Sequence, residues 1–316
     1  MSAVSRQRTW EKIPAPDISD PTYYDLPLLH EPVWEWAIPL YYYVGGVSGA
    51  SMALAAAAQL KSADAFDSLI QRCHRIGFVG TSLSSALLIW DLGRPSRFLN
   101  MLRVFRPTSA MNMGAWILSV SAGTAAATVV LPRRAGILRS VGHTLGFISG
   151  VFGLGLATYT GVLVGNSAIP VWQESRRVLP VLFGASAVAS VGSLFDFFEH
   201  VEQRRVTVLF GNIGRSAEIA AGMAMERQAG RVPRVAHPLK RGINGLLWRT
   251  ASLLTATSLV CSLLPNRTRA KRVAAGVLGT MGSLLIRFSV HHAGAISARD
   301  ARASFHHQRA GHGGRE

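Results

Sequence analysis

Long apolar stretches alternate with short polar segments along almost the whole chain. Each stretch holds about twenty residues with few charges, which is the length that an α-helix needs to cross a bilayer core of roughly 30 Å. The helices expected from this pattern span residues 38–60, 69–90, 110–131, 137–164, 179–198, 206–225, 243–264 and 273–296. The pattern therefore predicts an all-α integral membrane protein with eight transmembrane helices.

One polar segment, residues 91–107, reads D-L-G-R-P-S-R-F-L-N-M-L-R-V-F-R-P. Gly93 and Pro95 prevent the preceding helix from continuing in a straight line. Four arginines then alternate with bulky apolar residues, a pattern typical of a helix that lies in the membrane interface. We expect a short interfacial helix here.

The sixth apolar stretch is the least regular, because it contains Asn212, Arg215 and Glu218. Residues three apart on a helix share one face, so Arg215 and Glu218 could pair, and such a pair would face protein and not lipid. Glu218 is also a candidate for proton transfer through this part of the protein. A packed ion pair without any transport role is the alternative.

Composition and charge agree with a membrane protein. Of the 316 residues, 49% are hydrophobic, and the net charge of +16 comes from basic residues that fall mainly between the apolar stretches. We interpret them as contacts with lipid headgroups, with no role in nucleic-acid binding. Residues 1–31 lack the apolar core of a cleavable signal peptide, so the first helix is expected to direct insertion.

Cysteine and histidine usage limits the cofactors that the chain is expected to hold. Cys73 and Cys261 lie in or beside apolar stretches, so we expect neither a disulfide framework nor a cysteine-ligated cluster. His291 and His292 are adjacent and point about 100° apart on a helix, so they cannot easily share one metal. We predict no metal site, no haem and no iron–sulfur cluster in this chain.

Four separated motifs carry a family resemblance. They are P-V-W-E-W-A-I-P-L-Y-Y-Y-V-G-G at 32–46, the segment 91–107, Y-T-G-V-L-V-G-N-S-A-I-P-V-W at 159–172 and R-F-S-V-H-H-A-G at 287–294. Between about residues 23 and 303 the chain resembles the NrfD/PsrC family, the membrane subunits of polysulfide-reductase-like complexes.

The resemblance implies an architecture and a set of partners. It implies a first four-helix bundle with a quinone pocket at 38–164 and a second four-helix bundle at 165–296. The polar residues on either side are expected to form a surface arm at 1–37 and a charged C-terminal tail at 297–316. The subunit would bind a quinone, either menaquinone or ubiquinone. It would exchange electrons with a docked ferredoxin-like iron–sulfur subunit, which a molybdopterin or multihaem catalytic subunit would accompany.

Two tyrosines fall on the quinone-binding positions of the family. Tyr41 lies early in the first helix and Tyr159 late in the fourth, and both hydroxyls can donate hydrogen bonds to a quinone carbonyl. Tyr41 stands where one family member has a histidine, which makes proton transfer at this residue less effective near neutral pH. The alternatives are an interfacial anchor for Tyr41 and a helix-packing role for Tyr159.

Four more residues belong to the same end of the first bundle. Asp91 is a candidate proton carrier, and a salt bridge between Asp91 and Arg94 that only holds the turn is the alternative. His30, Trp36 and Arg94 are expected at the mouth of the quinone pocket. For His30 and Trp36, positions at the protein surface and at the membrane interface are the alternatives.

Location and function class leave alternatives open. The resemblance places the chain in the bacterial cytoplasmic membrane with both termini in the periplasm, whereas a weak excess of Lys and Arg on the terminal side alone favours cytoplasmic termini. The basic segments at 94–106 and 176–177 would then form the docking surface for the iron–sulfur subunit. A redox-inactive anchor and a secondary transporter remain the other two candidate classes.

Overall fold

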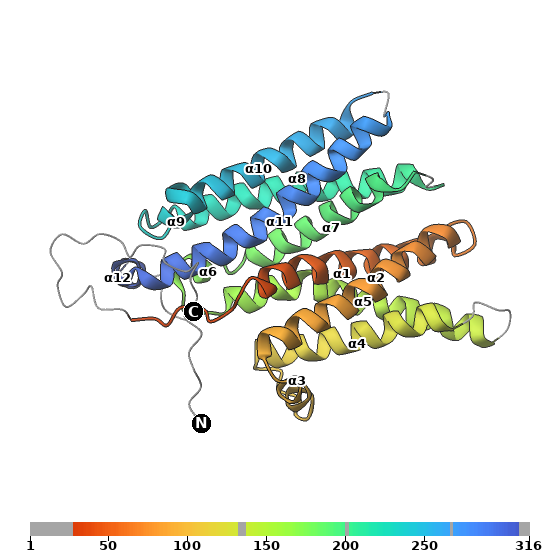
Figure 1. Cartoon of the computed structure of the whole chain (residues 1–316), viewed down its shortest axis with the longest axis horizontal. Helices are drawn as coiled ribbons and strands as arrows, with labels where there is room; N and C mark the ends of the chain where they lie inside the picture. Colours follow the sequence, from red (N-terminus) through yellow and green to blue (C-terminus); the bar gives the residue numbers. More distant parts are fainter. Residues whose placement is uncertain (1–27, 132–136, 200–201, 266–267, 310–316) are drawn as a thin grey trace.

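The computed structural model describes residues 28–131, 137–199, 202–265 and 268–309. Within these residues every regular element is a helix (Figure 1). The long helices are α1 (Ala37–Ser62), α2 (Asp67–Leu92), α4 (Ala110–Val130), α5 (Ile137–Gly165), α7 (Leu179–Phe197), α8 (Arg204–Ala229), α10 (Gly242–Leu263) and α11 (Arg269–Arg299). Each of the predicted apolar stretches thus forms one long helix, with ends that differ from the prediction by a few residues.

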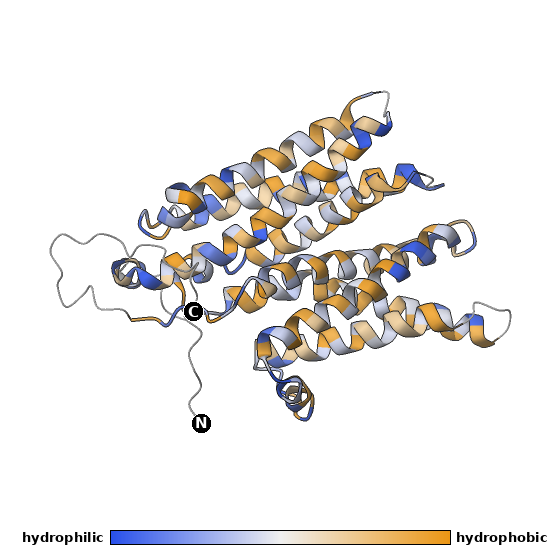
Figure 2. Ribbon diagram, viewed as in Figure 1, coloured by the Kyte–Doolittle hydropathy of each residue, from blue (hydrophilic) through white to orange (hydrophobic). Residues whose placement is uncertain are grey.

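Four short helices lie at one end of the molecule (Figure 1), which we call the connecting end. They are α3 (Pro95–Leu102), α6 (Pro170–Glu174), α9 (His237–Lys240) and α12 (Ala301–Arg309). The axis of α3 bends by 110° from that of α2 at the break after Leu92, where Gly93 adopts φ +70°. The short helix expected in the segment 91–107 is therefore present. Figure 2 shows that hydrophilic residues gather mainly toward the helix ends.

Not every long helix is apolar along its whole length. Five described helices, α4, α5, α7, α10 and α11, are long and apolar enough to cross a membrane, and α2 with α3 makes a sixth if the bent pair is one span. α8 has a polar face that carries Arg215 and Glu218, and α1 is rich in buried glycine and serine. The polar face of α8 is turned toward neighbouring helices, and α1 is largely buried, so apolar composition is not required of those surfaces.

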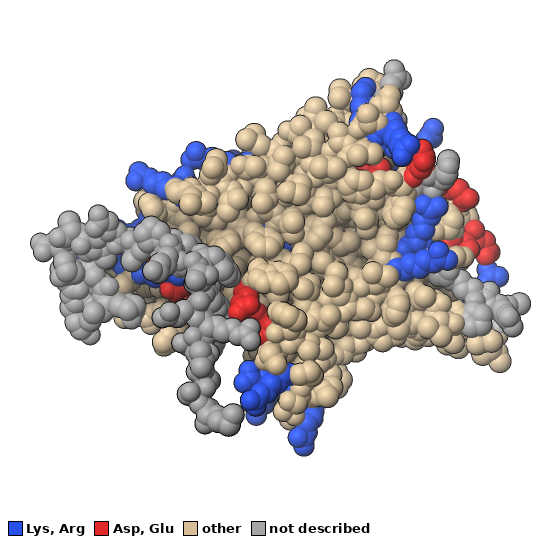
Figure 3. Space-filling view, viewed as in Figure 1, with Lys and Arg blue, Asp and Glu red and all other residues tan. Residues whose placement is uncertain are grey.

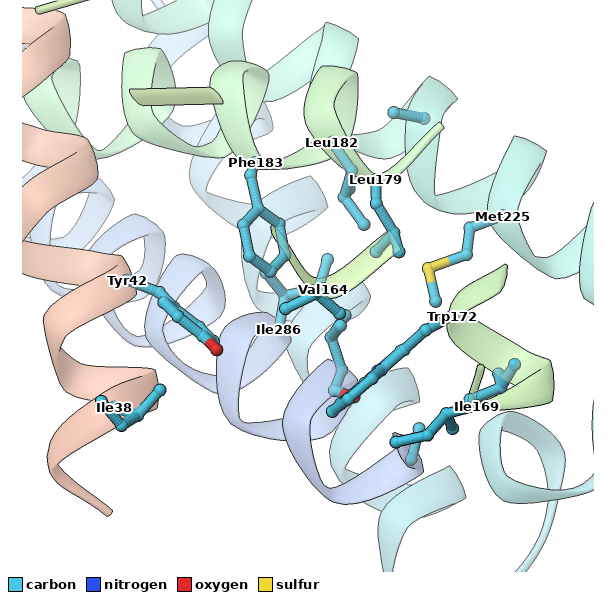
Figure 4. Close-up of a cluster of buried hydrophobic side chains, with 14 of the residues drawn as sticks. Ile38, Tyr42, Val164, Ile169, Trp172, Leu179, Leu182, Phe183, Met225 and Ile286 are labelled. Atoms are coloured by element: carbon cyan, nitrogen blue, oxygen red, sulfur yellow. The ribbon is translucent and has the colours of Figure 1, made fainter. Parts of the chain in front are cut away.

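The long helices pack as two groups. α1, α2, α4 and α5 contact one another, and so do α7, α8, α10 and α11, while α1 and α5 also contact α7 (Figure 1). The buried side chains at this junction include Tyr42 of α1, Phe183 of α7 and Ile286 of α11 (Figure 4). α1 thus lies at the centre of the molecule, in contact with helices of both groups.

The contact between α1 and α5 depends on glycine. A Cβ atom on Gly49 would overlap the backbone of Gly153 and would lie 2.8 Å from the backbone nitrogen of Ala157. A Cβ on Gly153 would in turn lie 2.6 Å from the carbonyl oxygen of Gly49. The small residues four apart in α1 therefore allow the close backbone approach that such spacing favours in membranes.

The C-terminal segment is more ordered than the sequence suggests. α11 continues to Arg299, and α12 follows at once, although a charged tail was predicted from residue 297. His307 of α12 and Glu174 of α6 are both buried, and their side chains approach to 3.1 Å. This contact holds α12 against the connecting end, while residues 310–316 lie outside the described part, as do residues 1–27 of the predicted arm.

Candidate functional site

Two predicted site tyrosines point into the first helix group. Tyr41 is 3% exposed and Tyr159 is 8% exposed. A Cβ placed on Gly45 would contact the ring of Tyr41 at 3.7 Å, Oγ of Ser84 on α2 at 3.5 Å and the side chain of Leu156 on α5 at 3.8 Å, so the Tyr41 ring lies on the side of α1 that faces α2 and α5. The ring of Tyr159 packs directly on Gly114 of α4, where any side chain would collide with it.

Tyr42 is a third tyrosine at this place, and the sequence reasoning did not single it out. Its side chain is 1% exposed, and its ring lies 5.9 Å from the ring of Tyr41 and 5.7 Å from that of Phe183. Its buried hydroxyl has no hydrogen-bond partner among the described residues.

Asp91 lies in the last turn of α2, at the connecting end. Its Oδ1 accepts a hydrogen bond of 3.2 Å from the backbone N–H of Glu35, in the segment that leads into α1. The carboxylate therefore connects the end of α2 to the beginning of α1. Asp91 thus lies at the same end of the molecule as the beginning of α1, and its role in proton transfer stays a prediction.

A cavity of about 470 Å³ opens between α4 and α5 beside Tyr159. Its walls include Met113 and Ile117 of α4 and Val162 and Asn166 of α5. The lining is divided almost equally between apolar and polar surface, and Tyr159 is the member of the tyrosine group that lines it. Such a space suits a flat ligand that has both apolar parts and oxygen atoms.

The structure does not bring the remaining predicted residues to this cluster. His30 and Arg94 are exposed, and Arg94 precedes the first turn of α3. Trp36, 48% exposed, lines a separate cavity of about 340 Å³ with Phe288 and His291 of α11. Contact of these three residues with a quinone stays a prediction.

A second polar cluster lies inside the other helix group, and it corrects the pairing expected for Arg215. The Arg215 guanidinium is fully buried and forms a 3.0 Å ion pair with Asp196 of α7. Glu218, one turn further along α8, accepts hydrogen bonds from Thr255 of α10 at 3.2 Å and Ser283 of α11 at 3.0 Å. The expected pairing of Arg215 with Glu218 is therefore replaced by contacts that each residue makes with a neighbouring helix.

Arg287 of α11 is the other buried cation, and the sequence reasoning gave it no role. Its guanidinium donates to the backbone carbonyls of Tyr42, at 3.0 Å, and Phe183, at 3.2 Å, and also to Oγ of Ser186. It also donates to the carbonyl of Ser283 at 3.1 Å, and the hydroxyl of Ser283 donates to Glu218. The available signal was an arginine within the apolar stretch of residues 273–296, a position that usually marks a buried polar network.

Exposed arginines gather around α3. The side chains of Arg94, Arg97, Arg103 and Arg106 are exposed, and basic residues are visible over this segment in Figure 3. The same segment exposes Leu99, Val104 and Phe105. α3 therefore presents a mixed basic and apolar surface close to Asp91.

Comparison with known proteins gives one family match. The family model described as "Polysulphide reductase, NrfD" matches residues 27–297, which is most of the chain. A comparison with curated proteins gives no match. The family resemblance carried by the four sequence motifs is thereby confirmed.

Proposed function

We propose that this chain, which belongs to the NrfD family and is a multi-pass membrane protein, is the quinone-reactive subunit of a respiratory oxidoreductase. All eight long helices would cross the bacterial cytoplasmic membrane as two four-helix bundles, with both termini in the periplasm. Electrons would pass between a quinone in the first bundle and an iron–sulfur subunit docked outside the membrane.

The observation that carries the proposal is the buried Tyr42 hydroxyl without a partner. A buried polar group normally has a hydrogen-bond partner, and leaving one unpaired costs about 1–3 kcal/mol. Tyr42 lies beside Tyr41, with the ring centroids 5.9 Å apart. A ligand oxygen that accepts a hydrogen bond would satisfy this hydroxyl.

These residues fit a quinone by their chemistry. A bound quinone supplies two-electron, two-proton chemistry, so its site needs donors for the carbonyl oxygens and a group that exchanges protons. The tyrosine hydroxyls can donate to the carbonyls and orient the ring. Asp91 can hold a proton on its carboxylate at the connecting end, and the cavity between α4 and α5 offers space for the ring beside Tyr159.

The polar side chains of the second group support a proton path as part of the same function. Glu218 meets hydroxyl groups from α10 and α11, and Arg287 links this region to α1. Ionisable residues inside a membrane protein usually line such paths, because each is costly to bury. The alternative remains a packed polar cluster that only holds the helices together.

The basic surface of α3 supports docking of a partner. Arg103 and Arg106 are exposed near Asp91, so an acidic iron–sulfur subunit bound there would lie close to the tyrosine cluster. Opposite charges favour fast and oriented association. A molybdopterin or multihaem catalytic subunit would complete the complex beyond it.

A titration with a soluble quinone analogue tests the proposal through quenching of tryptophan fluorescence in the purified chain. Tyr42→Phe and Tyr159→Phe each remove one hydroxyl and should raise the Kd about 10-fold or more, as expected for a lost buried hydrogen bond. Tyr43→Phe is the matched control, because this neighbouring ring faces Arg287. Absence of saturable binding in folded protein would favour a redox-inactive anchor or a secondary transporter.

A further inference from the structure

A separate cavity lies in the second helix group, away from the tyrosine cluster. It has a volume of about 610 Å³ and is bounded by the segment before α1, by α9, by the start of α10 and by the end of α11. This volume is within the range typical of small-molecule sites. None of the residues predicted for quinone contact lines it.

Two polar atoms in the walls of this cavity are buried and have no described partner. They are Oδ1 of Asn244 on α10 and Nδ1 of His291 on α11. The two side chains are only 4% and 5% exposed, and both residues line the cavity. The amide nitrogen of Asn244 donates to the carbonyl of Pro238 at 2.9 Å, which fixes Oδ1 as an acceptor that needs a donor.

One wall of the cavity is aromatic. The ring of His291 stacks on that of Trp34, with centroids 6.4 Å apart and planes inclined by 29°. Trp34 in turn stacks on Trp172, at 6.1 Å and 23°. Flat aromatic faces favour a flat ligand, because offset stacking adds to the apolar contact.

The charges around the cavity are largely compensated. Arg234 forms a 2.8 Å ion pair with Asp300. Arg299 forms a two-point ion pair with Glu31, in which Nε of Arg299 donates to Oε1 and Nη2 donates to Oε2 at 2.6 Å. The remaining arginine of the lining, Arg241, is exposed. An anionic headgroup would therefore meet few free cations, and a phosphodiester offers no donor to Asn244. The lining favours an uncharged ligand that carries hydroxyl groups.

The cavity also reaches the outer surface of α10. Ile243 lines it and is 82% exposed, and the neighbouring Leu246 is 65% exposed. In a membrane these side chains face lipid. A ligand with a polar ring inside could therefore extend an apolar tail outward along α10.

We propose that this cavity is a second quinol site, in which Asn244 and His291 accept hydrogen bonds from the ring hydroxyls and the isoprenoid tail passes Ile243 into the lipid. The identity of the ligand rests on the proposed function. The site itself is separate, because it is built from α9, α10 and α11, whereas the tyrosine cluster is built from α1, α2 and α5.

Photolabelling with an azido-quinone, followed by tryptic digestion and mass spectrometry, tests this site. The second site should label residues 242–249 or 288–299, whereas the tyrosine cluster should label residues 140–176. Asn244→Leu should reduce labelling of the first two peptides at least 10-fold and leave the third unchanged. Ala295→Phe, which fills the cavity, should do the same, and Ala274→Phe is its control on the same helix but outside the cavity.

The outcomes separate this inference from the proposed function. Label confined to residues 140–176 would overturn the second site and leave the first intact. Saturable label neither in these three peptides nor in residues 13–61, which contain Tyr41 and Tyr42, would overturn both. If a co-purified phospholipid is lost in Ala295→Phe while no quinone label appears at 242–249 or 288–299, the cavity is a lipid site and the inference is wrong.

Discussion

Replacement of Arg287 by methionine should destabilise the protein strongly. The guanidinium is 0% exposed and bonds to backbone carbonyls on α1 and α7, so it joins the two helix groups. Methionine has a similar length but neither the charge nor the donors. The substitution also leaves the buried Glu218 without its nearby cation.

The size of the effect follows from this loss of partners. Breaking a buried ion pair costs about 3–5 kcal/mol, because the other charge remains in a low-dielectric interior. Arg287 and Glu218 form no direct ion pair among the described residues but share Ser283 as a hydrogen-bond partner, so this range is the upper limit for the loss of Arg287. The double variant Glu218→Gln/Arg287→Met removes both charges. Its loss of unfolding free energy should be smaller than the summed losses of the two single variants, and the difference should exceed about 1 kcal/mol. Glutamine can still accept hydrogen bonds from Thr255 and Ser283.

The free energy of unfolding can be measured in mixed micelles with increasing dodecyl sulfate, followed by tryptophan fluorescence. Arg269→Met is the matched control at the surface end of the same helix, because Arg269 is 77% exposed in its ion pair with Glu199. It should cost no more than about 1 kcal/mol. If the free-energy losses of Glu218→Gln and Arg287→Met sum to that of the double variant within about 0.5 kcal/mol, the two charges are not coupled and the reasoning is refuted.

Two further substitutions test the helix contact and the docking surface. Gly49→Val should lower the stability by at least the 1–3 kcal/mol typical of overpacking, because α5 leaves no space for a side chain at this position. The loss should appear as a smaller fraction of monodisperse protein in size-exclusion chromatography. Gly123→Ala, where no atom lies within 4 Å, should be neutral or slightly stabilising, and an equal loss in both would contradict the packing argument. Charge reversal at Arg103 and Arg106 should abolish co-purification of the iron–sulfur partner, whereas Arg269→Glu at the other end should not. Unchanged co-purification would count against docking at α3.

The sequence predicted the long helices well, because apolar length and terminating residues are local signals. The break at Gly93 and Pro95 was readable for the same reason, since glycine accepts the positive φ that ends α2. α12 was missed because its residues are mostly polar, and only the contact of His307 with Glu174 shows that it packs. A contact across 133 positions leaves no mark in local periodicity.

The pairing rule for helices failed at Arg215 for a related reason. Spacing along one helix places Glu218 on the same face, but it says nothing about what the neighbouring helix presents. Asp196 on α7 lies within 3.0 Å and is itself buried, so it is the nearer compensation for the charge. Glu218 is then surrounded by hydroxyl groups, which hydrogen-bond to its carboxylate.

Tyr42 shows why the site could be predicted only in part. Its neighbour Tyr41 was chosen from the family motif, yet adjacent residues on a helix point about 100° apart, so the run of three tyrosines faces several directions. Tyr42 turns toward the junction, where its hydroxyl has no described partner while its carbonyl accepts from Arg287. One residue of α1 thus belongs both to the tyrosine cluster and to the charged network of the second group. That double role depends on packing between the groups, and neither the tyrosine run nor the isolated arginine in the sequence reveals it alone.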